Sequence, residues 1–246
     1  MCEAQESVER DAIVVALSDS LTSRGLDLIQ AFSLRSYNDV VNGQDTIPDF
    51  GRGDAFAVLI GNTRALWQKF IEALKMEPDR LESRHPLDVY VKTVVTEALG
   101  ELTCDVNWFV RWAHEHPSVG FAAQLMAEVS GMAARSPGHL SVHDTYGPWI
   151  AIRAVVIFDR EGGVVEPATL RCEGCLGGCT PAVAKALGDQ NSPTAVDGVL
   201  RNWRRWLEVR SACPAGVMHR YSESQIIYHY THDKELLIEA VKALII

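Results

Sequence analysis

Residues 141–159 read SVHDTYGPWIAIRAVVIFD, a glycine–proline corner with a histidine and two aromatic residues that opens directly into a hydrophobic segment. The second half, residues 149–158, is rich in β-branched and aromatic side chains and is the best strand candidate in the chain. A histidine and aromatic rings at the entrance of a buried strand are typical of a cofactor site. We therefore predict a central strand here, with a binding site at its start.

Helical and strand patterns alternate through the first two-thirds of the chain. Three-to-four-residue apolar spacing predicts helices over 8–21, 63–76, 86–99 and 118–134, and short apolar runs predict extended segments over 28–34, 54–62 and 103–112. Gly25 is a candidate stop for the first helix, and a turn or helix cap is expected at Tyr37, Asn38 and Asp39.

Beyond residue 160 only helical patterns follow a Gly- and Cys-rich loop, over 181–187, 194–211, 222–230 and 233–246. We therefore predict an α+β core with a helical C-terminal cap. The expected organisation is one domain over 1–246, with the α+β core at 1–160, the Cys-rich loop and a short helix at 161–192, and the helical cap at 193–246.

Composition and charge exclude several classes of protein. The 246 residues are 47% hydrophobic, which is enough to bury a full core, and the formal charge is −9. That balance argues against a dedicated nucleic-acid binder, and the basic Arg201, Arg204 and Arg205 form at most a local patch. No stretch approaches the roughly 18 apolar residues needed to cross a bilayer, and the N-terminus is acidic. We expect a cytoplasmic protein with no membrane or nucleic-acid partner.

Short motifs in the same order along nearly the whole chain resemble the CblC family, also called MMACHC, which processes cobalamin inside cells. The opening segment is similar to the family's H-P-R-F-G-G-W-F-A-I-R-G-V-V stretch, although His143 is followed here by Asp-Thr-Tyr and Pro148 replaces a glycine. Other similar segments are SYNDVV at 36–41, AFAVLIGNTRALWQKFIEAL at 55–74, HPLDVYV at 85–91, HPSVGFAAQLMAEVSGMAA at 116–134, NWRRW at 202–206 and RYSESQIIYHYT at 220–231.

The resemblance implies a central, mostly antiparallel sheet flanked by helices, as in flavin reductases and nitroreductases. It also implies that the chain binds cobalamin with its lower base displaced, then removes the upper axial ligand by reductive decyanation or glutathione-dependent dealkylation. Glutathione would be the cosubstrate and FMN or FAD a possible electron carrier. A flavin reductase or a downstream cobalamin carrier would be partners of a monomer or homodimer.

Three groups of residues are the candidates for these roles. The corrin-pocket candidates, taken from the family match and from the aromatic residues, are His143, Tyr146, Gly147, Pro148, Trp149, Trp203, Trp206 and Tyr221. Arg153, Arg210 and Arg220 are candidates for holding a carboxylate of glutathione or a flavin phosphate. A buried core is the ordinary role of such aromatics, and a solvated helix face is that of such arginines. His114 and His116 are expected to be structural.

Three cysteines in one loop, Cys172, Cys175 and Cys179, are the catalytic candidates for thiol exchange or contact with cobalt. They also resemble the last ligands of the ferredoxin motif of epoxyqueuosine reductases, cobalamin-dependent relatives. Zinc or a cluster would need a fourth donor such as Cys104 or Cys213. The third interpretation is a buried loop in which the thiols pack as small hydrophobic groups.

Three other functions fit the sequence less well. A flavin-dependent oxidoreductase of the same fold would share the aromatics and would show no spectral response to cobalamin. A non-catalytic cobalamin carrier, or a metal-binding relative that has lost the corrin pocket, would not turn over. No phosphate-binding signature marks a flavin site independently of the resemblance.

Overall fold

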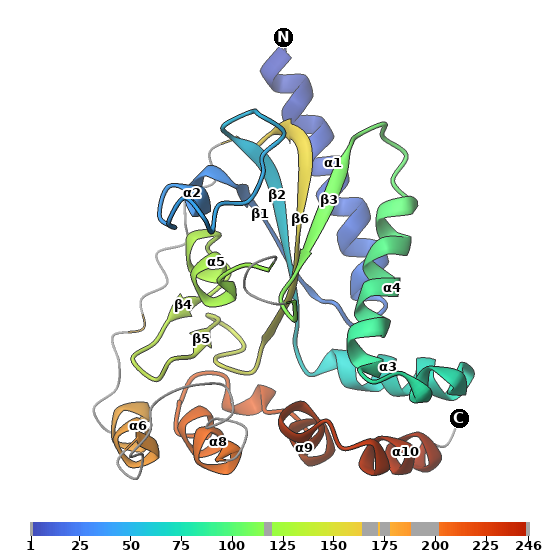
Figure 1. The fold of residues 1–246 in the computed structure, drawn as a ribbon, viewed down its shortest axis with the longest axis vertical. Coiled ribbons are helices and arrows are strands. Elements are labelled where there is room, and N and C mark those ends of the chain that lie inside the picture. Colours follow the sequence, from blue (N-terminus) through green and yellow to red (C-terminus); the bar gives the residue numbers. More distant parts are fainter. Residues whose placement is uncertain (1, 116–119, 164–171, 173–177, 188–201, 245–246) are drawn as a thin grey trace.

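The computed structural model describes residues 2–115, 120–163, 172, 178–187 and 202–244. Its centre is an antiparallel sheet of four strands in the order β1-β2-β6-β3 (Figure 1). The strands are β1 (Leu28–Ser33), β2 (Ala55–Asn62), β3 (Trp108–Trp112) and β6 (Ala151–Glu161). The predicted class, an α+β fold with an antiparallel sheet, is confirmed.

Both central strands, β2 and β6, send side chains into hydrophobic layers on the two faces of the sheet. Residues of β2 are buried along its whole length, with Phe56, Val58 and Ile60 on one face and alternate residues on the other. This alternation follows from the two-residue period of a strand. It explains why the segment reads as one continuous apolar run rather than as an alternating pattern.

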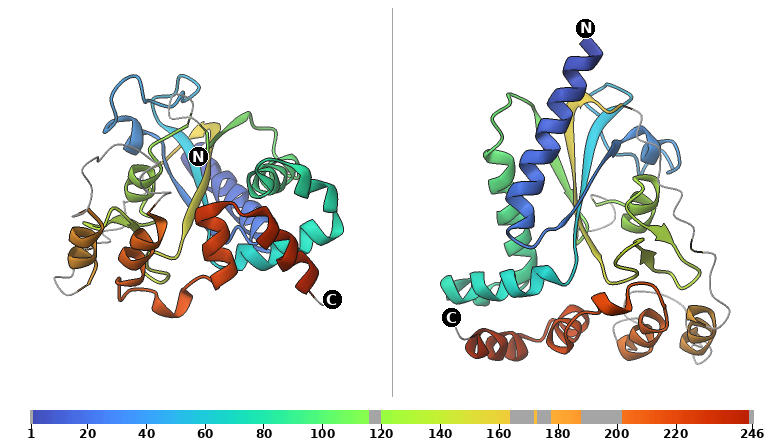
Figure 2. Two further views of the ribbon diagram at one scale, coloured as in Figure 1. Left: turned by 60° about the horizontal axis from the view of Figure 1, so that its bottom comes forward. Right: turned by 180° about the vertical axis from the view of Figure 1, so that it is seen from behind.

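Helices cover the sheet on both faces (Figure 2). One face packs against α1 (Cys2–Thr22), α3 (Ala65–Met76) and α4 (Pro86–Gly100). The other face packs against the short helix α2 (Arg35–Asn38) and against α5 (Ala123–Val129). The sheet is thus the middle of three layers.

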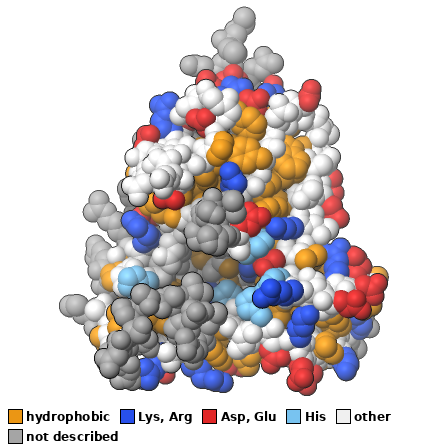
Figure 3. Space-filling model, viewed as in Figure 1, with side chains coloured by type: hydrophobic (Ala, Val, Ile, Leu, Met, Phe, Trp, Pro, Cys, Tyr) orange, Lys and Arg blue, Asp and Glu red, His pale blue; other side chains and the backbone are white. Residues whose placement is uncertain are grey.

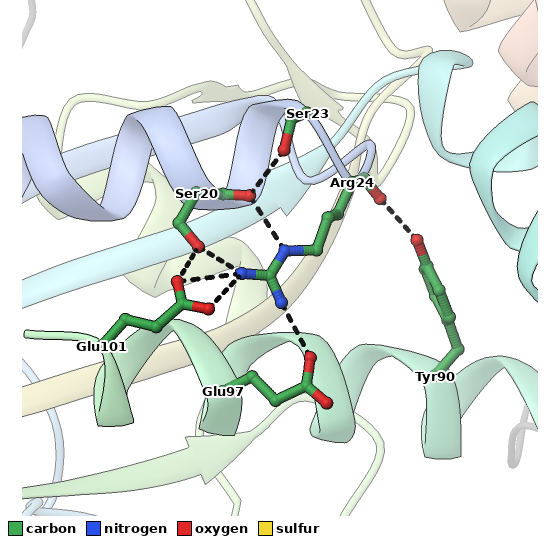
Figure 4. Close-up of polar contacts among 6 residues, drawn as sticks. All are labelled: Ser20, Ser23, Arg24, Tyr90, Glu97 and Glu101. Atoms are coloured by element: carbon green, nitrogen blue, oxygen red, sulfur yellow. Dashed lines mark hydrogen bonds and ion pairs between the residues drawn. The ribbon is translucent and has the colours of Figure 1, made fainter.

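A polar network joins α1 to α4 at the edge of the first layer (Figure 4). The Arg24 guanidinium forms ion pairs with Glu97 at 2.8 Å and with Glu101 at 3.1 Å, and it also donates to Ser20. The hydroxyl of Tyr90 donates to the Arg24 carbonyl oxygen at 2.8 Å. Arg24 therefore has one acidic partner in the last turns of α4 and a second at its C-cap.

The C-terminal helices lie in a row across one end of the sheet (Figure 1). They are α6 (Cys179–Leu187), α8 (Trp203–Ser211), α9 (Glu223–Thr231) and α10 (Lys234–Ala243). The side chain of Ser222 caps α9 by accepting from the Gln225 amide, and Asp233 caps α10 in the same way. These caps fix where the two helices begin, so they also fix which α9 side chains face the sheet.

Most predicted elements are confirmed within a few residues, but the predicted helix over 118–134 is wrong in its second half. The helix α5 ends at Val129, and Gly131 follows with a positive φ of 79°. The chain then forms a small hairpin, β4 (Ala134–Arg135) with β5 (Ser141–Val142). Glycine is favoured in that left-handed conformation, and it ends the helix that the small residues favour.

Two further boundaries differ from the prediction, and one part of the prediction is outside the described residues. The strand expected over 103–112 begins only at Trp108, because the preceding residues form a turn and an irregular stretch. Residues 194–201 of the predicted helix over 194–211 lie outside the described residues. The described part of this segment forms α8, which starts at Trp203. Among the helices that the structure describes, none is long and apolar enough to cross a membrane.

Candidate cofactor cleft

An open cleft of about 330 Å³ lies where the sheet meets the row of C-terminal helices. It is lined by the start of β6, α5, β5 and the residue before it, the residue after β3, and α8 and α9. Its residues are Ala113, Ala123, Gln124, Leu140, Ser141, Pro148, Ile150, Ala151, Ile152, Arg153, Arg210, His229 and Tyr230. Three alanines in this lining leave room that larger side chains would fill. A mostly apolar lining with a few polar groups is typical of cofactor sites.

A second, smaller cavity of about 160 Å³ adjoins the cleft. It shares Arg153 and His229 with the cleft, and its other lining residues are His85, Leu87, Asp88, His114, Tyr228 and His232. Histidine side chains gather beside a hollow in the middle of the face drawn in Figure 3. The two shared residues therefore form the wall between an apolar cleft and a histidine-rich cavity.

Arg153 is anchored by a neutral partner. Its Nε donates to Asn62 Oδ1 at 2.6 Å, and the Asn62 amide in turn donates to the Thr63 carbonyl oxygen at 2.7 Å. Burial lowers the pKa of Arg153, although a guanidinium remains protonated at pH 7. Among the described residues no carboxylate lies within ion-pair distance of it, although Asp88 of the adjoining cavity raises its pKa from farther away, so its positive charge lines the cleft without a direct ion-pair partner.

Arg210 is almost fully buried, with 4% of its surface exposed. Its guanidinium donates to the carbonyl oxygens of Pro148 at 2.9 Å and Ile150 at 3.2 Å. It also lies over the rings of Trp149 at 4.6 Å and Tyr221 at 4.7 Å. Carbonyls and aromatic faces orient a cation without neutralising it, so a second uncompensated positive charge lines the cleft.

His229 lies between these two cations. Its ring has edge-on contacts with Tyr230 and Tyr221, at centroid distances of 5.1 and 6.4 Å. Burial, followed by the positive charges of Arg210 and Arg153, lowers the pKa of His229 to about 3. The imidazole is therefore neutral at pH 7.

Two other histidines of the small cavity, His114 and His232, also have lowered pKa values. Burial lowers the pKa of His114, although Asp88, whose Oδ1 lies 3.8 Å from its Nδ1, opposes this effect. The pKa of His232 is likewise lowered by burial. Within the described residues, no three His, Cys, Asp or Glu side chains are placed to hold a metal ion together. His114 belongs to this cavity, and His116 lies outside the described residues.

The predicted corner at 143–147 forms a tight loop that closes on itself. The backbones of His143 and Gly147 exchange hydrogen bonds of 2.9 and 2.8 Å, and His143 Nδ1 accepts from the Thr145 amide at 3.0 Å. The His143 ring packs on Tyr146, with centroids 4.9 Å apart. These contacts make the histidine part of the loop, and neither cavity is lined by His143, Tyr146 or Gly147.

Gly147 makes close backbone contact with the segment before α9. Its φ is 57°, and a Cβ at this position would lie 2.1 Å from the Ala215 carbonyl oxygen. Gly216 meets the Tyr146 carbonyl oxygen in the same way and at the same distance. Two glycines with positive φ thus let two backbone segments of the chain come into direct contact. This contact places the Pro148 carbonyl next to the Arg210 guanidinium.

The predicted aromatic residues support the cleft more than they line it. Trp149 and Tyr221 are buried against each other, with centroids 5.6 Å apart. Trp203 stacks on the cleft residue Tyr230 at 5.4 Å. Trp206 packs instead among apolar side chains between α6 and α8. Pro148 is the one corrin-pocket candidate among the lining residues of the cleft.

Burial raises the pKa of the Tyr221 hydroxyl, while the charges of Arg210 and Arg153 lower it. This hydroxyl is buried and has no hydrogen-bond partner of normal geometry among the described residues. A buried phenol without a partner costs on the order of 1–3 kcal/mol. Such a cost is commonly tolerated next to a binding site.

Arg220, the third predicted anion-binding arginine, lies at the surface. It forms an ion pair with Glu223 at 3.3 Å and lies over the Trp149 ring at 5.6 Å. Neither cavity is lined by it. Its carboxylate partner distinguishes it from Arg153 and Arg210.

The cysteine candidates have separate surroundings where the structure describes them. Cys179 is buried at the start of α6 and packs against Val183, Ala186 and Val209. Cys172 is half-buried, and Cys175 lies outside the described residues. The environment of Cys179 is that of a small hydrophobic residue. The catalytic and metal hypotheses for the three thiols remain predictions.

Sequence reasoning missed the contributions of α9 and of residues next to β3 and α5. His229 and Gln124 line the cleft, and His85 and Asp88 line the adjoining cavity. One signal was present in the sequence, since the YHYTH run at 228–232 places polar rings beside the core residue Tyr228. A helix that buries Tyr228 turns its neighbour by about 100° toward another face.

Comparisons with known proteins support the fold. No family model and no curated protein matches the chain. Among solved structures, the chain is similar to a C. elegans B12-trafficking protein, CblC, described as a homologue of human MMACHC. That match has a TM-score of 0.68 and 18% identity, and it covers 98% of this chain and 99% of that chain. The resemblance predicted from sequence is confirmed at the level of the fold.

Two epoxyqueuosine reductases are matched more weakly. One, from Streptococcus thermophilus, has a TM-score of 0.48 and 9% identity, covering 92% of this chain and 79% of that chain. The other, labelled with selenomethionine, has a TM-score of 0.47 and 13% identity, covering 90% and 69%. These scores are too low to add to the argument.

Proposed function

We propose that this chain binds cobalamin in the cleft, with the lower base displaced, and promotes removal of its upper axial ligand. The observation that carries the proposal is the match of nearly the whole chain to the fold of a B12-trafficking protein, with an open cleft beside the predicted segment. Cobalamin bound there would supply the cobalt–carbon or cobalt–cyanide bond to be broken.

The residues of the cleft suit a corrinoid. The apolar side chains of Pro148, Ile150 and Ile152 offer a surface to a ring face, while Gln124 and Ser141 offer polar groups to its amides. At about 330 Å³ the cleft is at the lower end of the range for cofactor sites, roughly 300–1,000 Å³. A corrinoid would therefore be held by part of its surface and remain partly open to a cosubstrate.

Arg153 and Arg210 are the residues to which we assign the cosubstrate. A glutathione carboxylate would supply the counterion that both guanidinium groups lack, at a site where water is partly excluded. Nearby positive charge also lowers the pKa of a thiol and increases its thiolate fraction. The same two arginines would also suit the phosphate of a flavin. A reduced flavin is the electron donor expected for cyanocobalamin. Arg220 would act at the rim, where Glu223 competes for it.

Several other predicted residues do not line the cleft and instead hold the groups that do. Gly147 places the Pro148 carbonyl beneath Arg210, and Trp149 and Tyr221 supply the aromatic faces on which that guanidinium rests. Trp203 holds Tyr230 by stacking. His143 and Tyr146 keep the 143–147 loop closed. Each of these residues orients a group that lines the cleft.

The test is anaerobic turnover of methylcobalamin with glutathione, followed by absorbance and by the appearance of S-methylglutathione. We expect Arg210→Gln to raise the KM for glutathione by about 10- to 100-fold, the effect of losing a charge-assisted contact. Arg24→Gln, at the arginine paired with Glu97 and Glu101, is the matched control and should leave KM unchanged.

Three outcomes separate the alternatives. Demethylation with the expected KM change supports the proposal. Binding of methylcobalamin without turnover, with either glutathione or reduced flavin, would instead make the chain a carrier. Absence of any spectral change on adding cobalamin would reject the proposed function.

A further inference from the structure

The strand β3 is an edge of the four-stranded sheet, and of the described strands only β6 pairs with it. The amide of Ala113, directly after β3, donates to the carbonyl of Arg153 on β6 at 2.9 Å. In an antiparallel pair, residues that bond to the neighbour alternate with residues that point away from it. The odd-numbered residues of β3 therefore bond to β6. The residues whose backbone groups point outward are Trp108, Val110 and Trp112.

Most of these outward backbone groups have no partner. The Trp112 carbonyl accepts from the Glu115 amide at 3.2 Å in the turn after the strand. Within the described part of the chain, no hydrogen bond uses the amide or carbonyl of Trp108 or Val110, or the amide of Trp112. Such an edge is a template for another strand, and charges or proline commonly protect it. In β3 the one charged residue is Arg111, and there is no proline.

Apolar side chains surround this edge. Every residue of β3 is half-buried, although three of the five are aromatic. Phe50, in the loop before β2, is 40% exposed, and its ring centroid lies 5.4 Å from that of Phe109. Figure 3 shows hydrophobic side chains gathered where Figure 1 places β3. An apolar patch beside an unpaired strand indicates an interaction surface.

The sequence of β3, WFVRW, is complementary to itself when two copies run antiparallel with Val110 opposite Val110. Trp108 then faces Trp112 of the second copy, and aromatic cross-strand pairs stabilise a sheet. Phe109 faces Arg111 of the second copy. A guanidinium beside an aromatic ring is a favourable contact, and Arg111 already lies 5.7 Å from the Phe109 ring of its own chain. The charged residue thus meets a ring instead of a like charge.

We infer that two copies of this chain associate through their β3 edges, in an antiparallel pair centred on Val110. The contact is isologous, since the same residues contribute from both copies. Its two-fold axis is perpendicular to the sheet, so the two four-stranded sheets become one continuous sheet. The outward amide and carbonyl of Val110 bond to the same groups of the second copy. The inference goes beyond the proposed function, which needs one chain and a corrinoid.

The size of β3 sets the expected strength of the dimer. Standard protein interfaces bury roughly 1,200–2,000 Å². A strand of five residues, with the patch around Phe50, offers a smaller contact. We therefore expect a reversible dimer that is populated at about 100 μM and dissociates at about 1 μM.

The experiment is sedimentation velocity of the full chain across this range of concentrations. We expect Val110→Lys to be monomeric throughout, because the two new ammonium groups would face each other at the two-fold axis. Val15→Lys is the matched control, since Val15 is 58% exposed on α1, and it should dimerise like the wild type. Circular dichroism of both variants checks that they fold.

A cross-link tests the register. In Val110→Cys the two Cα atoms should lie about 5.5 Å apart, a separation that a disulfide can span. Added diamide takes two electrons and two protons from the facing thiols as the sulfur–sulfur bond forms. Arg111→Cys should not cross-link to itself, because residues one step from the axis lie farther apart than the roughly 7 Å limit. Mass spectrometry of peptides distinguishes this bond from those of the natural cysteines.

Three results would overturn the inference. They are a wild type that is monomeric at about 100 μM, a dimer that persists unchanged in Val110→Lys, and equal cross-linking of Val110→Cys and Arg111→Cys. The first result would leave the β3 edge to a strand of a different protein. Cobalamin binding is measured separately by absorbance, so failure of the dimer and failure of the proposed function are distinguishable.

Discussion

Arg24 between α1 and α4 and Arg153 at the cleft differ in their partners. Arg24 reaches two carboxylates at 2.8 and 3.1 Å, although both acids are more than half exposed. Arg153 reaches an asparagine oxygen, and the nearby Arg210 reaches two backbone carbonyls. The paired cation, Arg24, lies at the surface with exposed partners, whereas the two unpaired cations line the cleft.

This difference separates stability from binding. An ion pair at the surface offsets a small desolvation cost and contributes little to the free energy of unfolding. A buried cation without a counterion costs several kcal/mol, and a ligand anion would recover part of that cost on binding. Loss of Arg24 should therefore change stability only slightly and leave binding unchanged, whereas loss of Arg153 or Arg210 should lower the affinity for an anionic cosubstrate.

The largest loss of stability is expected for Gly147→Ala. The new Cβ would lie 2.1 Å from the Ala215 carbonyl oxygen at a φ of 57°, so the loop must move and carry with it the Pro148 carbonyl that anchors Arg210. We expect a loss of about 3 kcal/mol or more in the free energy of unfolding. Gly43→Ala, where no atom lies within 4 Å of the added Cβ, is the control in the same denaturant titration. Equal stability of the two variants would contradict this role.

Arg153→Gln removes the positive charge at the cleft while keeping a donor for Asn62. The affinity for glutathione should fall by about 100-fold, while the free energy of unfolding should not decrease, because an uncompensated buried charge is removed. Isothermal titration of the cobalamin-loaded protein measures the affinity, and thermal denaturation measures stability. A large loss of stability with unchanged affinity would place Arg153 among the structural arginines.

Burial of His229, together with the positive charges of Arg210 and Arg153, should also make the fold sensitive to acid. Because its folded pKa of about 3 is below the ordinary value of 6.5, the unfolded chain takes up the proton first. Stability is therefore fully present above pH 6.5 and is lost as the pH falls toward 3.

For a half-buried ring we expect about 2 kcal/mol of this dependence to disappear in His229→Gln, measured by urea unfolding at pH 7 and pH 4. His232→Gln, at an exposed position, should change the dependence less. An identical pH profile in the wild type and His229→Gln would show that His229 does not carry this dependence.

The smallest effect is expected at the paired arginine. Arg24→Gln loses both ion pairs, yet the exposure of Glu97 and Glu101 limits the cost to about 1 kcal/mol or less. High salt should reduce the difference further, because exposed charges are screened. Arg84→Gln, an exposed residue ahead of α4, provides the baseline. A change in cosubstrate affinity in Arg24→Gln would contradict the conclusion that only the unpaired arginines of the cleft take part in binding.

Sequence patterns predicted the fold where the periodicity was long. The strand β6 and the helices α3 and α4 have continuous apolar runs or stripes, and all three form where expected. The β4–β5 hairpin was not predicted, since strands of two residues carry no period. The end of α5 depends on Gly131 adopting a positive φ, which competes with the helical preference of its alanine-rich neighbours.

The candidate site was predictable only in part. Arg153 and Arg210 were named as anion-binding residues, and both line the cleft without a carboxylate partner among the described residues. Trp149 was expected at the surface of a pocket, but its ring is buried beneath Arg210. His229 was missed because its position depends on how α9 packs against the end of the sheet, a long-range contact that local spacing does not encode.

The most direct test of the account is an anaerobic absorbance titration with methylcobalamin of the wild type and of two tryptophan variants in α5 and its N-cap. Ala123 lines the cleft, whereas the adjacent, exposed Ala122 does not. We predict a base-off spectral shift that saturates in the wild type and in Ala122→Trp, and its loss in Ala123→Trp, where the indole fills the cleft. No shift in the wild type, or an equal shift in Ala123→Trp, would contradict binding of cobalamin at this site.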